Sequence, residues 1–84
     1  MTYPDYAKFS QWLKESVEAR AGRMDDKTLA ESIHTGTTTF SAWMTGKSKF
    51  NKSAAHLIAF VYGLNWQYIC ETAYEYTGDK SWLN

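Results

Sequence analysis

One stretch of the sequence, from residue 37 to 52, combines hydroxyl groups, aromatic rings and lysines without a single acid. It reads TTTFSAWMTGKSKFNK and contains three of the chain's nine Lys and Arg residues but none of its nine Asp and Glu residues. Hydroxyl groups can donate to or accept from base edges, and ammonium groups neutralise phosphates. The rest of the chain carries the other six bases and all nine acids, so this stretch is its only positive region, and its chemistry is that of a nucleic-acid contact.

Two residues elsewhere could in principle act in catalysis, His56 as a base and Cys70 as a nucleophile. They fall on different predicted helices, and no orienting acid or oxyanion motif accompanies them. Cys70 is also the only cysteine, which excludes an internal disulfide and a Cys-rich zinc site. The sequence therefore predicts no catalytic residue, no metal site, no cofactor and no enzymatic activity.

The totals are those of one small folded domain covering residues 1–84. With 44% apolar and 17% aromatic residues, the chain is too hydrophobic for disorder and should bury a core. No apolar run approaches the ~20 residues that span a bilayer, and the N-terminus lacks the pattern of a secretion signal. We therefore expect a cytoplasmic protein.

Helical periodicity and capping residues place the acid-free stretch within a series of helices. Apolar residues recur at three- and four-residue spacing, Asp25 and Asn65 are suitable N-caps, and Gly46 is suited to a left-handed C-cap. The expected helices run from Pro4 to before Gly22, from Asp25 to before His34, from about Thr37 to Thr45, from roughly Ser53 to Tyr62, and from Asn65 to before Gly78. Nothing is typical of a strand, so the predicted fold class is all-α with five helices.

The second and third of these helices are joined by a short turn containing glycine, which is typical of the DNA-binding helix-turn-helix. The sequence LAESIHTGTTTFSAWMTGKSKF resembles the phage repressor and Cro type of helix-turn-helix, the XRE or lambda repressor-like family. The matching residues are Leu29, Ala30, Ile33, Ser41, Trp43, Gly46 and Lys47. Further on, IAFVYGLNWQYI is similar to the family's last two helices, with Tyr68 and Ile69 expected to close the core. The resemblance implies a lambda repressor-like domain with its helix-turn-helix at about 26–45 and a C-terminal extension at about 71–84.

The resemblance also implies a function and a set of contacts. It implies a sequence-specific transcriptional regulator, a phage or prophage-type repressor that binds double-stranded operator DNA as a homodimer. The helix starting near Thr37 would enter the major groove, and the loop after it would follow the phosphates. The implied base contacts are Thr37, Thr38, Ser41 and Ala42, and the implied phosphate contacts are Lys47, Ser48, Lys49, Asn51 and Lys52.

The C-terminal extension carries more apolar surface than a monomer normally leaves in water. We expect its residues Tyr74, Tyr76, Trp82 and Leu83 to form the dimer or a partner-binding surface; the alternative is that the extension folds back on the first helix.

Two acids depart from the family's pattern at the start of the second helix. Asp25 and Asp26 stand where the family commonly places a neutral residue against a phosphate, and carboxylates repel phosphate. His34 also replaces a usual turn glycine. These departures and the zero net charge favour a second hypothesis, a protein-interaction module such as an antirepressor or adaptor on the same fold.

Overall fold

Five α-helices and a short 3-10 helix make up the protein in a computed structural model that describes residues 2–83. They are α1 (Pro4–Ala21), α2 (Asp26–Ser32), α3 (Thr37–Thr45), α4 (Lys52–Tyr62), α5 (Trp66–Thr77) and the 3-10 helix η1 (Lys80–Leu83). No strand occurs among the described residues. The predicted all-α class and the predicted helix positions are therefore confirmed.

Local side-chain caps explain where three of the helices begin. Asp25, Asn51 and Asn65 each accept a hydrogen bond from the backbone N–H three residues further on, which satisfies a donor that has no partner inside the helix. The capping roles of Asp25 and Asn65 agree with the sequence prediction. The capping role of Asn51 was not predicted, because the residue was assigned to the phosphate contacts as a neutral donor.

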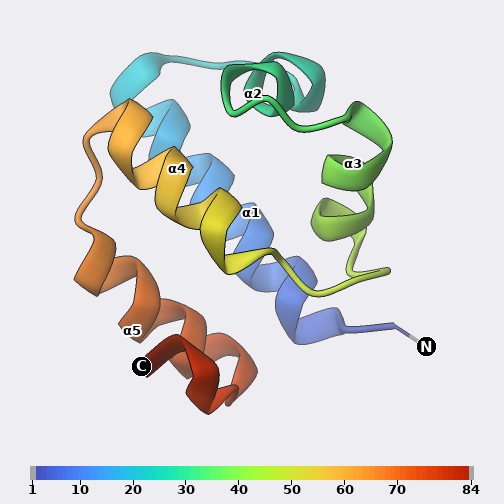
Figure 1. Cartoon of the computed structure of the whole chain (residues 1–84), viewed down its shortest axis with the longest axis vertical. Coiled ribbons are helices and arrows are strands. Elements are labelled where there is room, and N and C mark those ends of the chain that lie inside the picture. Colours follow the sequence, from blue (N-terminus) through green and yellow to red (C-terminus); the bar gives the residue numbers. More distant parts are fainter. Residues whose placement is uncertain (1, 84) are drawn as a thin grey trace.

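Helix α1 is the central element of the fold, and it packs against α3, α4 and α5. In Figure 1 it runs diagonally behind α4, with α2 across the top, α3 on the right and α5 on the lower left. Its apolar stripe, with residues three and four positions apart, is buried throughout: Tyr6, Phe9, Leu13 and Val17. The surrounding helices pack their apolar sides against this stripe. The side of α3 that faces away from the stripe is therefore exposed to solvent.

The C-terminal extension folds back on α1, so the assignment of Trp82 to a dimer surface is wrong. Trp82 is only 2% exposed, its ring lies 5.3 Å from that of Phe9, and its indole N–H donates to the Tyr6 hydroxyl. Tyr6 in turn donates to Asp79 at 2.8 Å. Of the other residues assigned to that surface, Tyr74 packs partly against the core, while Tyr76 and Leu83 are exposed.

Tyr68 was also placed wrongly, because it was expected to close the core and is 58% exposed. The buried side of α5 runs through Ile69, Thr72 and Ala73. Successive helical residues differ by about 100° in direction, so the residue before Ile69 points away from this stripe. The Tyr68 ring packs edge-on against Trp12 at the surface instead.

Gly46 ends α3 at a position where two requirements coincide. It is left-handed (φ 77°), and a Cβ there would lie 2.6 Å from the carbonyl oxygen of Tyr3, in the segment that leads into α1. The change Gly46→Ala is therefore expected to lower the free energy of unfolding by about 2–3 kcal/mol, measured by urea titration.

Gly78→Ala is the matched control for this change. Gly78 caps α5 with nearly the same backbone (φ 69°) but has nothing within 4 Å of the added Cβ. Gly78→Ala should lower the free energy of unfolding only by the cost of placing a residue with a Cβ in the left-handed conformation, about 1 kcal/mol. Equal losses in the two variants would show that the close approach to Tyr3 contributes nothing.

Candidate nucleic-acid interface

Helices α2 and α3 are two short helices joined by residues 33–36. The turn closes with two backbone hydrogen bonds to the Ala30 carbonyl, from Ile33 and Thr35, and His34 adopts a left-handed φ of 57°. The positive φ explains why a glycine would also suit position 34, and histidine occupies it at a modest conformational cost. This turn fixes the direction in which α3 leaves α2.

One side of α3 is buried, which leaves the opposite side on the surface. Phe40, Trp43 and Met44 are buried, and the Trp43 ring lies 4.7 Å from that of Phe50. Trp43 is therefore a core residue. Because apolar residues anchor α3 along this side, its small polar residues face outward.

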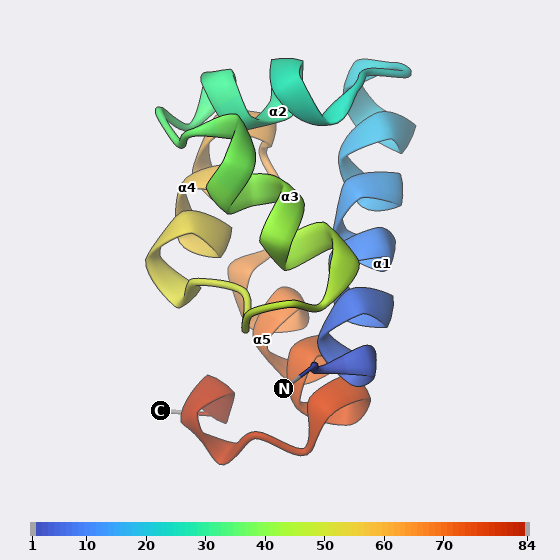
Figure 2. The same ribbon diagram turned by 90° about the vertical axis from the view of Figure 1, so that its right-hand side faces the viewer.

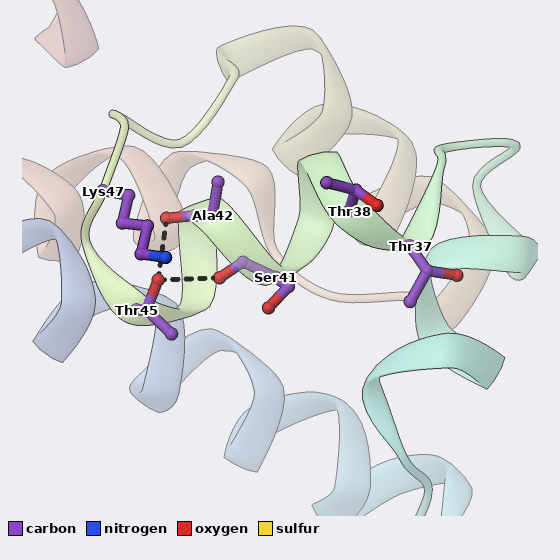
Figure 3. Close-up of a pocket in the computed structure, with 6 residues that line it drawn as sticks. All are labelled: Thr37, Thr38, Ser41, Ala42, Thr45 and Lys47. Atoms are coloured by element: carbon purple, nitrogen blue, oxygen red, sulfur yellow. Dashed lines mark hydrogen bonds between the residues drawn. The ribbon is translucent and has the colours of Figure 1, made fainter.

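All four residues assigned to base contacts come together on the outer face of α3. Thr37, Thr38, Ser41 and Ala42, with Thr45 and Lys47, line a shallow open groove of about 380 Å³ (Figure 3). We call these six residues the α3 face. It carries hydroxyl and methyl groups, one ammonium group and no carboxylate, so it can offer hydrogen bonds and thymine-methyl contacts to base edges.

Thr45 belongs to the α3 face but was missing from the sequence-based set. Its hydroxyl donates to the Ser41 carbonyl at 3.0 Å (Figure 3), a local side-chain hydrogen bond within the last turn of the helix. The spacing could have revealed it, because Thr38, Ser41 and Thr45 are three and four residues apart and therefore share one side of a helix.

Lys47 and Ser48 follow directly after α3, where their backbone N–H groups both donate to the Ala42 carbonyl. These bonds hold the start of the loop against the end of the helix. The side chain of Lys47 is exposed at one end of the groove. Of the five residues assigned to phosphate contacts, these two are the ones that the fold places beside the α3 face.

The other two lysines of the loop contact the C-terminal turn. The Lys49 ammonium lies 4.0 Å from the Asp79 carboxylate and 5.5 Å from the centre of the Tyr3 ring. The Lys52 ammonium donates to the Ser81 carbonyl at 2.7 Å. A phosphate that used either ammonium would have to compete with these contacts, so Lys47 is the strongest candidate for a charge contact.

The two acids at the start of α2 both have partners within the fold. Asp25 accepts from the Thr28 N–H, and this hydrogen bond lowers the pKa of the carboxyl group below its usual value. Asp26 forms an ion pair with Lys14 at 2.8 Å. Asp26 is therefore partly neutralised by Lys14, whereas Asp25 keeps a net negative charge at the N-terminus of α2.

Asp79 gives the fold an acid-sensitive contact next to this loop. Hydrogen bonds from the hydroxyl and backbone N–H of Ser81 and from the Tyr6 hydroxyl lower the pKa of Asp79 from 3.8 to about 2. Because the folded-state pKa is the lower one, the carboxylate stabilises the fold above about pH 4 and this contribution is lost as the pH falls toward 2.

We therefore expect Asp79→Asn to remove part of the acid sensitivity. The wild-type protein should lose about 1–2 kcal/mol more than the variant between pH 5 and pH 2, allowing for solvent screening of a partly exposed group. Urea unfolding at several pH values measures the difference. Parallel pH profiles would show that the Tyr6 and Ser81 hydrogen bonds do not favour the ionised form.

His56 and Cys70, the residues considered for catalysis, both pack against other parts of the fold. The His56 ring packs on Trp66 at 4.7 Å, and burial raises the pKa of the Cys70 thiol, which disfavours the reactive thiolate. Within residues 2–83 no group of three or more His, Cys, Asp and Glu side chains could hold a metal ion. In the same part of the chain, no helix has the length and apolar character needed to cross a membrane.

Comparison of the chain with protein-family models, with curated proteins and with solved structures found no significant match. The case for a function therefore depends on the residues of the α3 face and their surroundings.

Proposed function

We propose that the protein is a sequence-specific DNA-binding regulator with a lambda repressor-like helix-turn-helix, in which α3 enters the major groove. The observation that carries this proposal is the α3 face: four residues assigned to base contacts from the sequence share one exposed, acid-free groove with Lys47 at its edge. As a phage or prophage-type repressor, the protein would act by occupying an operator.

The chemistry of this face also indicates how DNA would be read. Short hydroxyl side chains and the Ala42 methyl discriminate bases less strongly than a bidentate Arg, Asn or Gln contact does. Part of the specificity should therefore come from DNA shape and from the pairing of two half-sites. Selection from a pool of random duplexes is expected to recover a short palindromic motif.

A protein-interaction module on the same fold is the second candidate. It is favoured by the engagement of Lys49 and Lys52 with the C-terminal turn, which leaves few ammonium groups directed outward from the loop. Such a module would bind its target with little dependence on salt and without a contribution from Lys47.

The change Lys47→Ala distinguishes the two candidates. Each phosphate neutralised contributes about 0.9 to the slope of log affinity against log salt. The variant should therefore bind the selected duplex more weakly, and its slope should be shallower by about 0.9 for each copy of the protein bound. Fluorescence anisotropy at several salt concentrations gives both quantities.

Lys80→Ala serves as the matched control, because Lys80 is an exposed lysine in η1 rather than beside α3. It should leave the affinity and the slope unchanged. If both lysine variants reduce the slope equally, the contact is not at the α3 face. If no duplex is enriched even at low salt, DNA binding is excluded and the protein-interaction module becomes the leading candidate.

A further inference from the structure

Helix α4 exposes a group of large apolar side chains that no other part of the described chain covers. Leu57 is 48% exposed, Phe60 74% and Val61 51%. Phe60 and Val61 follow Leu57 by three and four residues, so all three lie on one side of the helix. We call these three residues the α4 patch.

The opposite side of α4 is apolar as well. Ala54, Ala55, Ile58 and Ala59 are buried against the rest of the fold. A surface helix normally carries charged or polar residues on its outer side, and a helix that is hydrophobic all round is normally buried. After Lys52 at its first position, α4 contains no Asp, Glu, Lys or Arg. Its exposed polar residues, Ser53 and His56, lie in its first half, so the second half has the composition of a helix covered on both sides.

We propose that the α4 patch is the contact surface between two copies of this chain in a two-fold symmetric dimer. In such a contact the same residues meet from both sides, so any charge in the patch would face its own copy. Leu57, Phe60 and Val61 carry no charge, and the patch can therefore pair with itself without repulsion. A partner recognised through complementary charge would find no group to pair with here.

The position of α4 relative to α3 fits a dimer that binds DNA; this part of the inference rests on the proposed function. Helix α4 crosses the side of the molecule that faces the viewer in Figure 1, whereas α3 crosses the side that faces the viewer in Figure 2. These two views differ by 90°, so the two helices lie on adjacent sides. We place the two-fold axis in the plane of the α4 contact and direct it outward on the α3 side. Both α3 faces then point in the same direction, as two half-sites on one side of a duplex require.

The patch consists of three side chains, which is few compared with the roughly 20–30 residues a side of a standard stable interface. We therefore expect reversible association in the micromolar range. Sedimentation equilibrium of the full chain without DNA, at concentrations up to about 100 µM, should show a monomer–dimer equilibrium. The change Phe60→Glu should weaken the dimer at least about tenfold, because it would bring two carboxylates together in the contact.

Leu83→Glu is the matched control, because Leu83 is an exposed apolar residue in the C-terminal extension, with 53% of its surface accessible. This variant should dimerise like the wild-type protein. Circular dichroism of both variants should show unchanged helix content, since neither side chain is buried. A monomeric wild-type protein at the highest concentration would overturn the proposal. So would a dimer that Leu83→Glu disrupts and Phe60→Glu does not.

This experiment is independent of DNA binding. A dimer that depends on Phe60 but binds no duplex would support the α4 contact and exclude the proposed function. A monomer that binds the selected duplex with a salt dependence set by Lys47 would overturn the α4 contact and leave the proposed function standing.

Discussion

Replacing Phe9 by alanine is expected to lower the free energy of unfolding by about 3–5 kcal/mol, the range for a phenylalanine removed from a packed core. Phe9 is fully buried, and its ring packs against those of Trp12, Phe50 and Trp82 at 6.0, 5.9 and 5.3 Å. These rings belong to α1, the loop before α4, and η1. The cavity would therefore open where three separate parts of the chain meet.

A loss of this size is a large part of the total stability of a small domain, which is about 5–15 kcal/mol. Urea unfolding followed by tryptophan fluorescence measures it, and a variant that is unfolded without denaturant agrees with the expectation. Leu83→Ala is the control, because an exposed side chain should cost less than about 0.5 kcal/mol. A Phe9→Ala protein as stable as this control would contradict the observed core.

Replacing Ser41 by glutamate should have the largest effect on the proposed activity, a loss of about 100-fold in affinity for the selected duplex. Ser41 lies in the middle of the α3 face, between Thr38 and Thr45, where no acid is present. A carboxylate there would be brought close to the phosphates and base acceptors of the groove that α3 enters, and these groups would repel it.

Ser41→Gln is the matched control, since glutamine has nearly the same size and shape as glutamate but no charge. Ser41 is exposed, and its carbonyl, rather than its hydroxyl, accepts the hydrogen bond from Thr45. Both variants should therefore unfold at the same urea concentration as the wild-type protein. Equal DNA affinity in the glutamate and glutamine variants would show that the α3 face does not contact DNA.

The helices were predictable because the signals that define them are local. Asp25 and Asn65 cap the helices that directly follow them, and Gly46 and Gly78 take the left-handed conformation at the ends of α3 and α5. Each signal acts within about four residues. The four-residue grouping on α3 was predictable for the same reason, since helical spacing alone decides which side chains share a face.

The environment of the loop between α3 and α4 was not predictable in this way. Lys52 bonds to a carbonyl 29 residues away, and Lys49 lies beside Asp79. The burial of Trp82 likewise depends on Phe9 and Tyr6, at the other end of the sequence. The neighbouring sequence does not show whether a tryptophan is buried in the core or lies in a dimer contact. Nor does it show whether a lysine contacts another part of the chain or points into solvent.

Two hydrogen bonds join the ends of this 84-residue chain. The one from Tyr6 to Asp79 spans 73 residues, and the one from Trp82 to Tyr6 spans 76. Contacts between such distant residues form late, because the entropy of closing so large a loop must be lost first. The α2–α3 pair needs only near neighbours and can form early. During synthesis, the side of Phe9 that Trp82 covers should stay exposed until Trp82 has left the ribosome, so chains that stop short of η1 are expected to aggregate.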